Sequence, residues 1–446
     1  MNTIKKAFPQ VSVACKLLLV ILLVVSFVFG YASRANAQEP LCVQPFQPVS
    51  KPLTELGNTP YVRMGGQKTE FTGGLYPDGS NQRPAEHEAA GLAIAAQITP
   101  LNRDGQPDPV DGKIVMVAIG MSNTNTEFNR FMGMAHKDRE INPKLVLING
   151  ALGGRTAERW IDPNGDTWQE VNRLIAEKDL TPLQVQVAWV KQTLTGGGEF
   201  PAKALELQSG LEEIARNLKR NYPNIKIAYY SSRTRSYTYG RGLSPEPVAF
   251  ETGFSVKWMI EKQINQDPTL NYDPARGQVA APFLSWGPYL WIDGTNPRSD
   301  GRIWTAAEMT SDCTHPSPSG AIMIGEMLLE FFKTDTLAEP WFLASLATPT
   351  VAAIDLSNAP TATLVSPPTT ADLNRSTAEV PTPGPTEIRP QNTSQLSVIA
   401  TSTPRLPISQ KRTPNATIMI TILAMLSVVV AVGWFWLRPR VFIEKR

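Results

Sequence analysis

Residues 114–123, Ile-Val-Met-Val-Ala-Ile-Gly-Met-Ser-Asn, lead from an unbroken apolar run directly into a polar turn. A short apolar run rich in branched residues is typical of a strand that is covered on both faces of a parallel sheet. Gly120 permits a tight turn after this strand, and Ser122 stands at its exit. The stretch therefore predicts a central strand with a hydroxyl group at its carboxyl end.

Similar short runs alternate with helix-like segments along the rest of the central region. This alternation predicts the α/β class, with a central parallel sheet between layers of helices. We expect further strands at 145–149, 185–189 and 225–230, and helices at 85–97, 126–135, 167–176, 202–222, 250–266 and 317–333.

Polar or glycine-bearing segments follow all four predicted strands, at 120–123, 149–156, 191–192 and 231–235. In open α/β sheets, ligands bind outside the carboxyl ends of the strands. We therefore expect the functional site at this edge of the sheet.

The start of the chain is typical of a targeting segment. Lys5 and Lys6 precede an apolar run, and Ala35-Asn36-Ala37 offers the small residues that a signal peptidase requires. We predict a signal peptide at 1–37, with an uncleaved N-terminal anchor as the alternative.

The end of the chain predicts a membrane anchor. Residues 416–437 contain no charge and are long enough to cross a bilayer, and the basic segment 438–446 is typical of a cytoplasmic tail. The Pro-, Thr- and Ser-rich segment 344–415 is expected to form a disordered stalk. The protein is thus expected in the cell membrane, single-pass, with its bulk extracytoplasmic. A buried helix of a soluble protein is the alternative for 416–437.

Between these ends we expect an irregular leading segment, 38–111, packed on a domain at 112–343. The net charge of +2 and the lack of a basic stripe argue against nucleic acid as a partner. Three histidines and no Cys/His cluster predict neither a metal nor another cofactor. Cys42 and Cys313 would remain in the mature chain, either as one disulfide or as two free thiols.

Three side chains have the makings of a nucleophilic catalytic unit. Ser122 would be the nucleophile, His315 its general base, and Asp312 the carboxylate that orients the imidazole. His87 and His136 stand near predicted helix ends, where structural roles are expected. The alternative is that Ser122 caps a helix and that Asp312 caps a turn.

Donors for a developing oxyanion are expected next to this unit. The glycines at 149–156 bring backbone N–H groups close to a ligand, so Gly154 is one candidate and the amide of Gln192 is another. Asn123, Arg155 and Lys191 stand beside these positions and are expected to contact the substrate. A plain turn for the glycines and a solvated Lys191 are the alternatives.

In chain order, these segments resemble the blocks of the SGNH/GDSL hydrolase superfamily, particularly its sialate O-acetylesterase-like branch. Gly120 and Ser122 match the first block, in which Met121 replaces an Asp. The segment Gly153-Gly154-Arg155-Thr156 with Trp160 resembles the Gly-Gly-Thr…Trp block, and Asp312-Cys313-Thr314-His315-Pro316 resembles the closing Asp-x-x-His block. The third block departs, because Val190-Lys191-Gln192-Thr193 stands where the family has Gly-x-Asn-Asp.

The resemblance covers residues 113–332 and implies a three-layer α/β/α sandwich in which Ser122, His315 and Asp312 carry the reaction and Gly154 and Gln192 hold the oxyanion. It implies a serine esterase for carboxylic esters, with O-acetyl groups on glycans as candidate substrates. Two alternatives remain: an inactive surface module that binds carbohydrate or a partner protein, and a lipase or thioesterase of the same superfamily.

Overall fold

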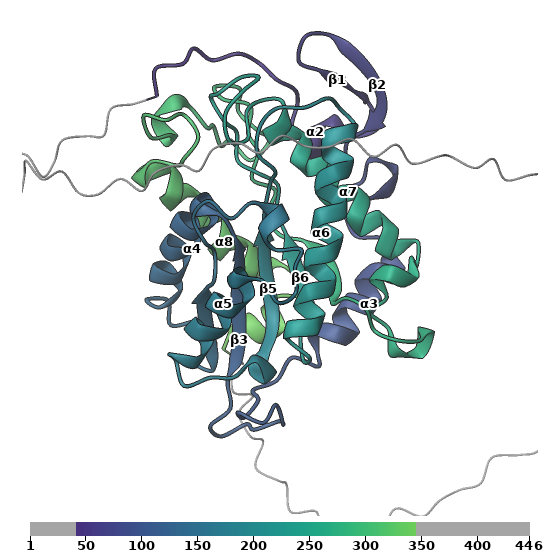
Figure 1. Ribbon diagram of the computed structural model, residues 1–446, viewed down its shortest axis with the longest axis vertical. Helices are drawn as coiled ribbons and strands as arrows, with labels where there is room; N and C mark the ends of the chain where they lie inside the picture. The colour runs from purple at the N-terminus through teal and green to yellow at the C-terminus, as the bar shows by residue number, and fades with distance from the viewer. Residues whose placement is uncertain (1–41, 345–446) are drawn as a thin grey trace, which may run out of the picture. The chain divides into compact units, whose positions relative to one another are not determined.

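Five parallel strands form the centre of the structure, a computed structural model that describes residues 42–344 (Figure 1). Their order across the sheet is β4-β3-β5-β6-β7, and every neighbouring pair is parallel. The strands are β3 (Ile114–Gly120), β4 (Leu145–Asn149), β5 (Val185–Lys191), β6 (Ile227–Tyr230) and β7 (Phe283–Trp286). The four predicted strands are confirmed to within two residues, whereas β7 was not predicted.

Helices cover both faces of this sheet. Those that contribute to the core on one face are α5 (Asp166–Ala176), α6 (Ala202–Asn221) and α7 (Val248–Ile264). Those on the other face are α3 (Ala85–Ala95), α4 (Ser122–Ala135), α8 (Pro318–Thr334) and the short α9 (Glu339–Phe342). The result is a mixed α/β fold with a parallel sheet flanked by helices, consistent with the expected three layers.

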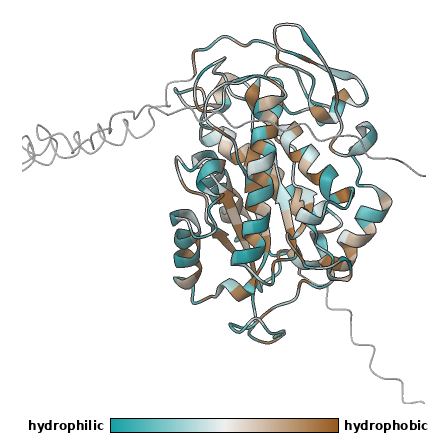
Figure 2. Cartoon of the chain, turned by 45° about the vertical axis from the view of Figure 1, so that its right-hand side comes forward, coloured by the Kyte–Doolittle hydropathy of each residue, from teal (hydrophilic) through white to brown (hydrophobic). Residues whose placement is uncertain are grey.

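The side chains of β3 show why this sheet is stable. All seven residues of β3 are buried. Val115, Val117 and Ile119 belong to the core on one face, and Ile114 and Met116 to the core on the other. Burying such a side chain contributes about 1.5–3 kcal/mol. Figure 2 shows the same pattern, with hydrophobic strands inside and hydrophilic colour on the outer helices.

The leading segment is more regular than expected. It contains α2 (Leu53–Leu56) and an antiparallel hairpin of β1 (Pro60–Arg63) and β2 (Gln67–Thr72), besides the predicted helix α3. Gly65 and Gly66 make the turn of the hairpin with φ angles of 96° and 92°, a left-handed conformation that favours glycine. The prediction of an irregular segment is therefore wrong for these residues.

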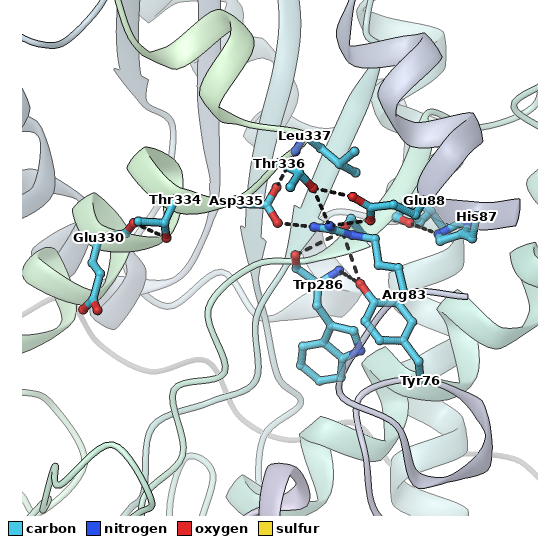
Figure 3. Close-up of polar contacts among 12 residues, drawn as sticks. Tyr76, Arg83, His87, Glu88, Trp286, Glu330, Thr334, Asp335, Thr336 and Leu337 are labelled. Carbon is cyan, nitrogen blue, oxygen red and sulfur yellow. Dashed lines mark hydrogen bonds and ion pairs between the residues drawn. The ribbon is translucent and has the colours of Figure 1, made fainter. Parts of the chain in front are cut away.

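Arg83 ties the leading segment to the sheet (Figure 3). Its Nε donates to Ser285 Oγ in β7 at 2.9 Å, and its Nη1 donates to Glu88 at 2.9 Å. A third contact joins its Nη2 to Asp335, directly after α8. Because Arg83 is about one-tenth exposed, the three contacts hold α3, β7 and α8 together in a partly desolvated position.

His87 has the structural role that was expected. Its ring stacks on Phe283 with centroids 4.3 Å apart, and its Nε2 lies 3.0 Å from the carbonyl oxygen of Leu284. Burial lowers the pKa of His87 to about 4, and the charge of Arg83 lowers it further against the opposing effects of the Leu284 carbonyl and Glu88. The imidazole is therefore neutral near pH 7.

The burial of His87 predicts that the folded protein loses stability in acid. Because the pKa of His87 is lower in the folded chain than the usual value of about 6.5, its contribution to stability is present above pH 6.5 and is lost as the pH falls towards 4. We expect a loss of about 3 kcal/mol in the free energy of unfolding over that interval. Urea unfolding of wild type and His87→Gln at several pH values measures it, with His136→Gln as the exposed control. Equal pH slopes for wild type and His87→Gln would contradict the prediction.

Six short 3₁₀ turns complete the described elements: Pro77–Gly79, Ala157–Arg159, Pro182–Gln184, Pro268–Leu270, Pro274–Arg276 and Ala306–Glu308. Among residues 42–344, no helix has both the length and the apolar character needed to span a bilayer. The predicted signal peptide, the stalk after Ala344, the membrane span and the basic tail lie outside the described residues.

Candidate active site

The candidate site lies where the strand order of the sheet reverses. β4 lies on one side of β3, and β5, β6 and β7 follow in chain order on the other side. Loops leave β3 and β5 in opposite directions at such a point, which opens a crevice at their carboxyl ends. Ser122 begins α4 two residues after β3 ends, so the helix start places it at this edge of the sheet.

Three residues predicted as one unit lie within contact distance. Ser122 Oγ is 2.7 Å from His315 Nε2, and His315 Nδ1 is 2.5 Å from Asp312 Oδ2. The Asp312 carboxylate accepts the proton of Nδ1, which leaves the Nε2 lone pair for the Ser122 hydroxyl. The side chains of His315 and Asp312 are 35% and 50% exposed, so the unit is open to an incoming molecule.

The Asp312 carboxylate is held in its charged form. Partial burial would raise its pKa, but the backbone N–H groups of His315 and Thr314, the His315 ring and the Thr310 hydroxyl together lower the pKa to about 2. Both backbone groups donate to Asp312 Oδ1 at 2.9 Å. One oxygen therefore fixes the loop, while the other orients the imidazole.

The loop that carries His315 is held by a disulfide and by two hydrogen bonds to other parts of the chain. Cys313 forms a disulfide with Cys42, with the two Cα atoms 5.0 Å apart, which answers the question that the sequence left open. Cys313 has a φ of 61°, and its carbonyl oxygen accepts from Tyr237 N at 2.9 Å. Asn123 Nδ2 donates to the carbonyl oxygen of Thr314 at 2.9 Å. The start of α4 and the His315 loop are thereby joined directly.

The glycine-bearing loop after β4 lies beside Ser122. A Cβ atom built on Gly153 would stand 4.0 Å from the Cβ of Ser122. Gly154 has a φ of 71°, which glycine adopts without strain. Among residues 42–344, neither the N–H of Ser122 nor that of Gly154 has a hydrogen-bond acceptor. Both groups are therefore free to donate to a bound oxygen atom.

Gln192 lies inside the domain, beside the glycine loop. It is 2% exposed, and its Nε2 donates to the carbonyl oxygen of Arg155 at 3.3 Å. The amide thus supports the glycine loop, and its role as an oxyanion donor stays a prediction. Gln192 is buried here because it directly follows β5, whose seven residues are all buried.

Two of the three predicted substrate contacts, Asn123 and Lys191, need correction. Lys191 and Asn123 are completely buried, so neither reaches a molecule at the surface of the site. Asn123 instead holds the His315 loop, as described above. Arg155 lies on the glycine loop and is partly exposed, but its Nη2 pairs with Asp166 at 2.7 Å. Of the three, only Arg155 stays within reach of the crevice.

Lys191 forms a buried ion pair with Glu127, with Nζ to Oε2 at 2.5 Å and both side chains fully buried. Burial lowers the pKa of Lys191 to about 8, against the pull of Glu127 and with a further lowering by Arg233. The pair joins the end of β5 to the first turns of α4, directly behind Ser122. Sequence reasoning missed Glu127, because nothing in its local pattern distinguishes it from an exposed helix carboxylate.

Two further supporting residues were missed as well. Thr310 Oγ1 donates to Asp312 Oδ1 at 2.8 Å, and Asn125 Nδ2 donates to the carbonyl oxygen of Ala151 at 2.7 Å. The first contact is local, because Thr310 stands two residues before Asp312 in the same loop. The second joins α4 to the glycine loop across 26 residues of sequence, and the sequence carries no signal for that contact.

The arrangement resembles a nucleophile with an adjacent base and free N–H donors. A hydroxyl that hydrogen-bonds to a carboxylate-oriented imidazole can be deprotonated as it attacks a carbonyl carbon. The free N–H groups of Ser122 and Gly154 are donors of the kind that can stabilise a negatively charged oxygen atom. Within residues 42–344, no three His, Cys, Asp or Glu side chains are grouped so as to hold a metal ion.

Comparison with known proteins does not assign this chain to a family. No family model matches the chain, and no curated protein matches it. Solved structures with some similarity include a protein from Arabidopsis thaliana (10% identity, TM-score 0.25, 46% of this chain and 65% of that chain). Another is the periplasmic domain of a lipopolysaccharide acetyltransferase from Salmonella ser. Paratyphi A (14% identity, TM-score 0.21, 34% of this chain and 57% of that chain). A third is a gut microbial diltiazem-metabolizing enzyme (15% identity, TM-score 0.28, 52% of this chain and 48% of that chain). The chain spans less than two thirds of each.

Proposed function

We propose that this protein is a serine esterase that cleaves carboxylic esters through an acyl-enzyme. The observation that carries the proposal is the 2.7 Å contact between Ser122 Oγ and His315 Nε2, with Asp312 on the other ring nitrogen. An unactivated serine hydroxyl is a weak nucleophile, and this geometry supplies the base that activates it. The resemblance of the three motifs to SGNH/GDSL hydrolases supports the same reaction.

In the proposed reaction, Ser122 Oγ forms a bond to the ester carbonyl carbon while its proton moves to His315 Nε2. The tetrahedral oxyanion accepts hydrogen bonds from the N–H groups of Ser122 and Gly154. The intermediate then collapses, the alcohol leaves with the proton from His315, and water resolves the acyl-enzyme by the same route. Asp312 remains charged throughout, because its pKa of about 2 keeps it ionised.

We propose acetyl groups on glycans as the substrate class. The partial exposure of His315 and Asp312 is compatible with a bulky alcohol portion that stays outside the crevice. The position of Arg155, on the glycine loop next to Ser122, offers a guanidinium to polar groups of such an alcohol once it leaves Asp166.

The proposed location is outside the cytoplasm, with an anchor at 416–437. The Cys42–Cys313 disulfide supports it, because structural disulfides persist mainly in oxidising compartments. The predicted signal peptide and membrane span complete this proposal from the sequence.

A panel of ester substrates tests the proposal. The full chain, kept in lipid nanodiscs, is given nitrophenyl esters of increasing acyl length and an O-acetylated sugar. Hydrolysis that is fastest for acetyl esters supports the esterase, and a preference for long acyl chains favours a lipase or thioesterase. Folded protein that binds the sugar but hydrolyses none of the esters would establish the inactive binding module instead.

We expect the variant Asp312→Asn to lose turnover and to keep its folded structure. The amide oxygen can still accept from the N–H groups of Thr314 and His315, but the amide nitrogen cannot accept the Nδ1 proton. The imidazole then adopts the wrong tautomer, and we expect kcat to fall by about 10³–10⁴-fold with little change in KM. Steady-state kinetics measure both constants, with the melting temperature as the folding control. A fall in kcat of less than tenfold would reject the role given to Asp312.

A further inference from the structure

A cavity lies at the opposite end of the sheet from Ser122. It has a volume of about 740 Å³ and is bounded by α3, by the ends of α6 and α7, and by the segment 266–283. Ile225, which precedes β6, and Phe283, which begins β7, are buried residues of its floor. Because both stand at the amino ends of their strands, this cavity is separate from the candidate active site. Its volume suits a small organic ligand.

The wall formed by 266–283 is held in place by the side-chain amides of Gln263, which is buried, and Asn271, which is half-buried. Gln263 Nε2 donates to the carbonyl oxygens of Leu270 and Pro282 at 2.9 and 3.0 Å, and its Oε1 accepts from Leu284 N at 2.7 Å. Asn271 Nδ2 donates within the same segment to Asp273 and Gln278, both at 3.0 Å. The cavity is therefore built into the fold, and a ligand would not have to order this wall.

Charge is distributed unevenly along the cavity. Lys219 and Lys226 line one end, where Lys226 Nζ donates to Gln97 Oε1 at 3.0 Å beyond the end of α3. Among the described residues, neither lysine has a carboxylate within ion-pair distance. Burial lowers the pKa of both, and the charge of Lys226 lowers that of Lys219 further. An ammonium has three donors, so each retains donors for an anion.

The rest of the lining is mostly apolar. Ala90, Ala93 and Ile94 of α3 line it, together with Tyr272 and Val279 of the segment 266–283. Glu86 lines the cavity in the first turn of α3. It stands eleven residues before Gln97, and eleven residues of helix span about 16 Å. Asp273 also lines it, but its carboxylate accepts from Ala275 N at 2.9 Å and lies 3.5 Å from Arg276. One end is thus cationic, and an apolar trough leads away from it.

We propose that this cavity binds a single-chain amphipathic carboxylate, such as a medium-chain fatty acid. Its carboxylate contacts Lys219 and Lys226, and its chain lies along Ala93, Ile94 and Phe283 towards the other end. Charge complementarity supports this occupant, since two ammonium groups without carboxylate partners stand at the mouth of an apolar trough. The neutral, stacked ring of His87 adds no charge to the floor. The proposal is independent of the reaction proposed for Ser122.

Calorimetric titration of the full chain in lipid nanodiscs with sodium decanoate tests this site, with empty nanodiscs as the blank. Decanoate is expected to bind at one site per chain, and decanol, which has the same chain without the charge, at least fivefold more weakly. No saturable binding of decanoate beyond the blank would overturn the proposal. Equal affinity for decanol would also overturn it, because the lysines would then play no part.

Variants locate the binding. The double change Lys219→Met and Lys226→Met should weaken decanoate at least fivefold, and Ala93→Trp, which fills the trough from an exposed helix position, should abolish binding. Lys178→Met, an exposed lysine that does not line the cavity, should leave the affinity unchanged. Decanoate affinity that is unaffected by Ala93→Trp would place the ligand elsewhere and reject the site. The rate of ester hydrolysis should stay within twofold of wild type in all of these variants. The ligand site and the role of Ser122 can therefore be rejected independently of each other.

Discussion

Replacing Ser122 with alanine should lower kcat/KM for acetyl-ester hydrolysis by about 10⁴-fold or more. The variant keeps the His315–Asp312 contact and the N–H donors of the crevice, but no oxygen remains to form the acyl-enzyme. In serine hydrolases, loss of the nucleophile removes nearly all of the contribution of the catalytic unit. Initial rates with a nitrophenyl acetate over a wide range of enzyme concentration measure a loss of this size.

A matched serine controls for nonspecific effects. Ser311 stands in the same loop as Asp312 and is exposed, so Ser311→Ala should stay within about twofold of wild type. Unfolding curves of both variants should coincide with wild type within about 0.5 kcal/mol. If Ser122→Ala retained a tenth or more of the wild-type rate, another nucleophile would be responsible, and the assignment of Ser122 would be abandoned.

Breaking the buried ion pair behind the site should have the largest effect on stability. In Lys191→Met, the Glu127 carboxylate loses its partner 2.5 Å away in a place without solvent. An uncompensated buried charge costs about 3–5 kcal/mol. The free energy of unfolding from urea titration at pH 7 should fall by that amount. Ester hydrolysis should fall as well, because Glu127 lies on α4, the helix that begins at Ser122.

Two further variants distinguish the contribution of the Lys191–Glu127 ion pair from other effects of the substitution. Glu177→Gln removes an exposed ion pair with Arg173 on α5 and should cost less than about 1 kcal/mol. Glu127→Leu combined with Lys191→Met removes both charges and should recover much of the stability lost in Lys191→Met. A Lys191→Met protein as stable as wild type would show that the pair does not contribute as described.

The sheet and three side chains of the site were predictable because local patterns carry them. Apolar runs with branched residues mark buried parallel strands, and the carboxyl ends of such strands share one edge. Ser122 follows the strand at 114–120 directly. The three-residue spacing of Asp312 and His315 brings their side chains to one side of a turn, so their contact is local as well.

The remaining errors have one physical origin. Lys191 is a polar residue at the end of β5, and its sequence neighbourhood does not indicate whether it faces the crevice or the interior. The burial of Lys191 depends on Glu127, which is 64 residues away in sequence. β7 was missed because Phe283–Trp286 contains no β-branched residue and includes the polar Ser285, and its place is fixed by pairing with β6. Long-range partners of this kind decide the outcome where local patterns do not.

The most direct measurement is covalent labelling of the full chain with a fluorophosphonate, followed by mass spectrometry of its peptides. These reagents form a stable bond only with a serine hydroxyl that a neighbouring base activates. Phosphonylation of Ser122 at one group per chain, absent from Ser122→Ala and strongly slowed in Asp312→Asn, is the predicted result. Folded wild-type protein that remains unlabelled, or that carries the label on another residue, would contradict the esterase.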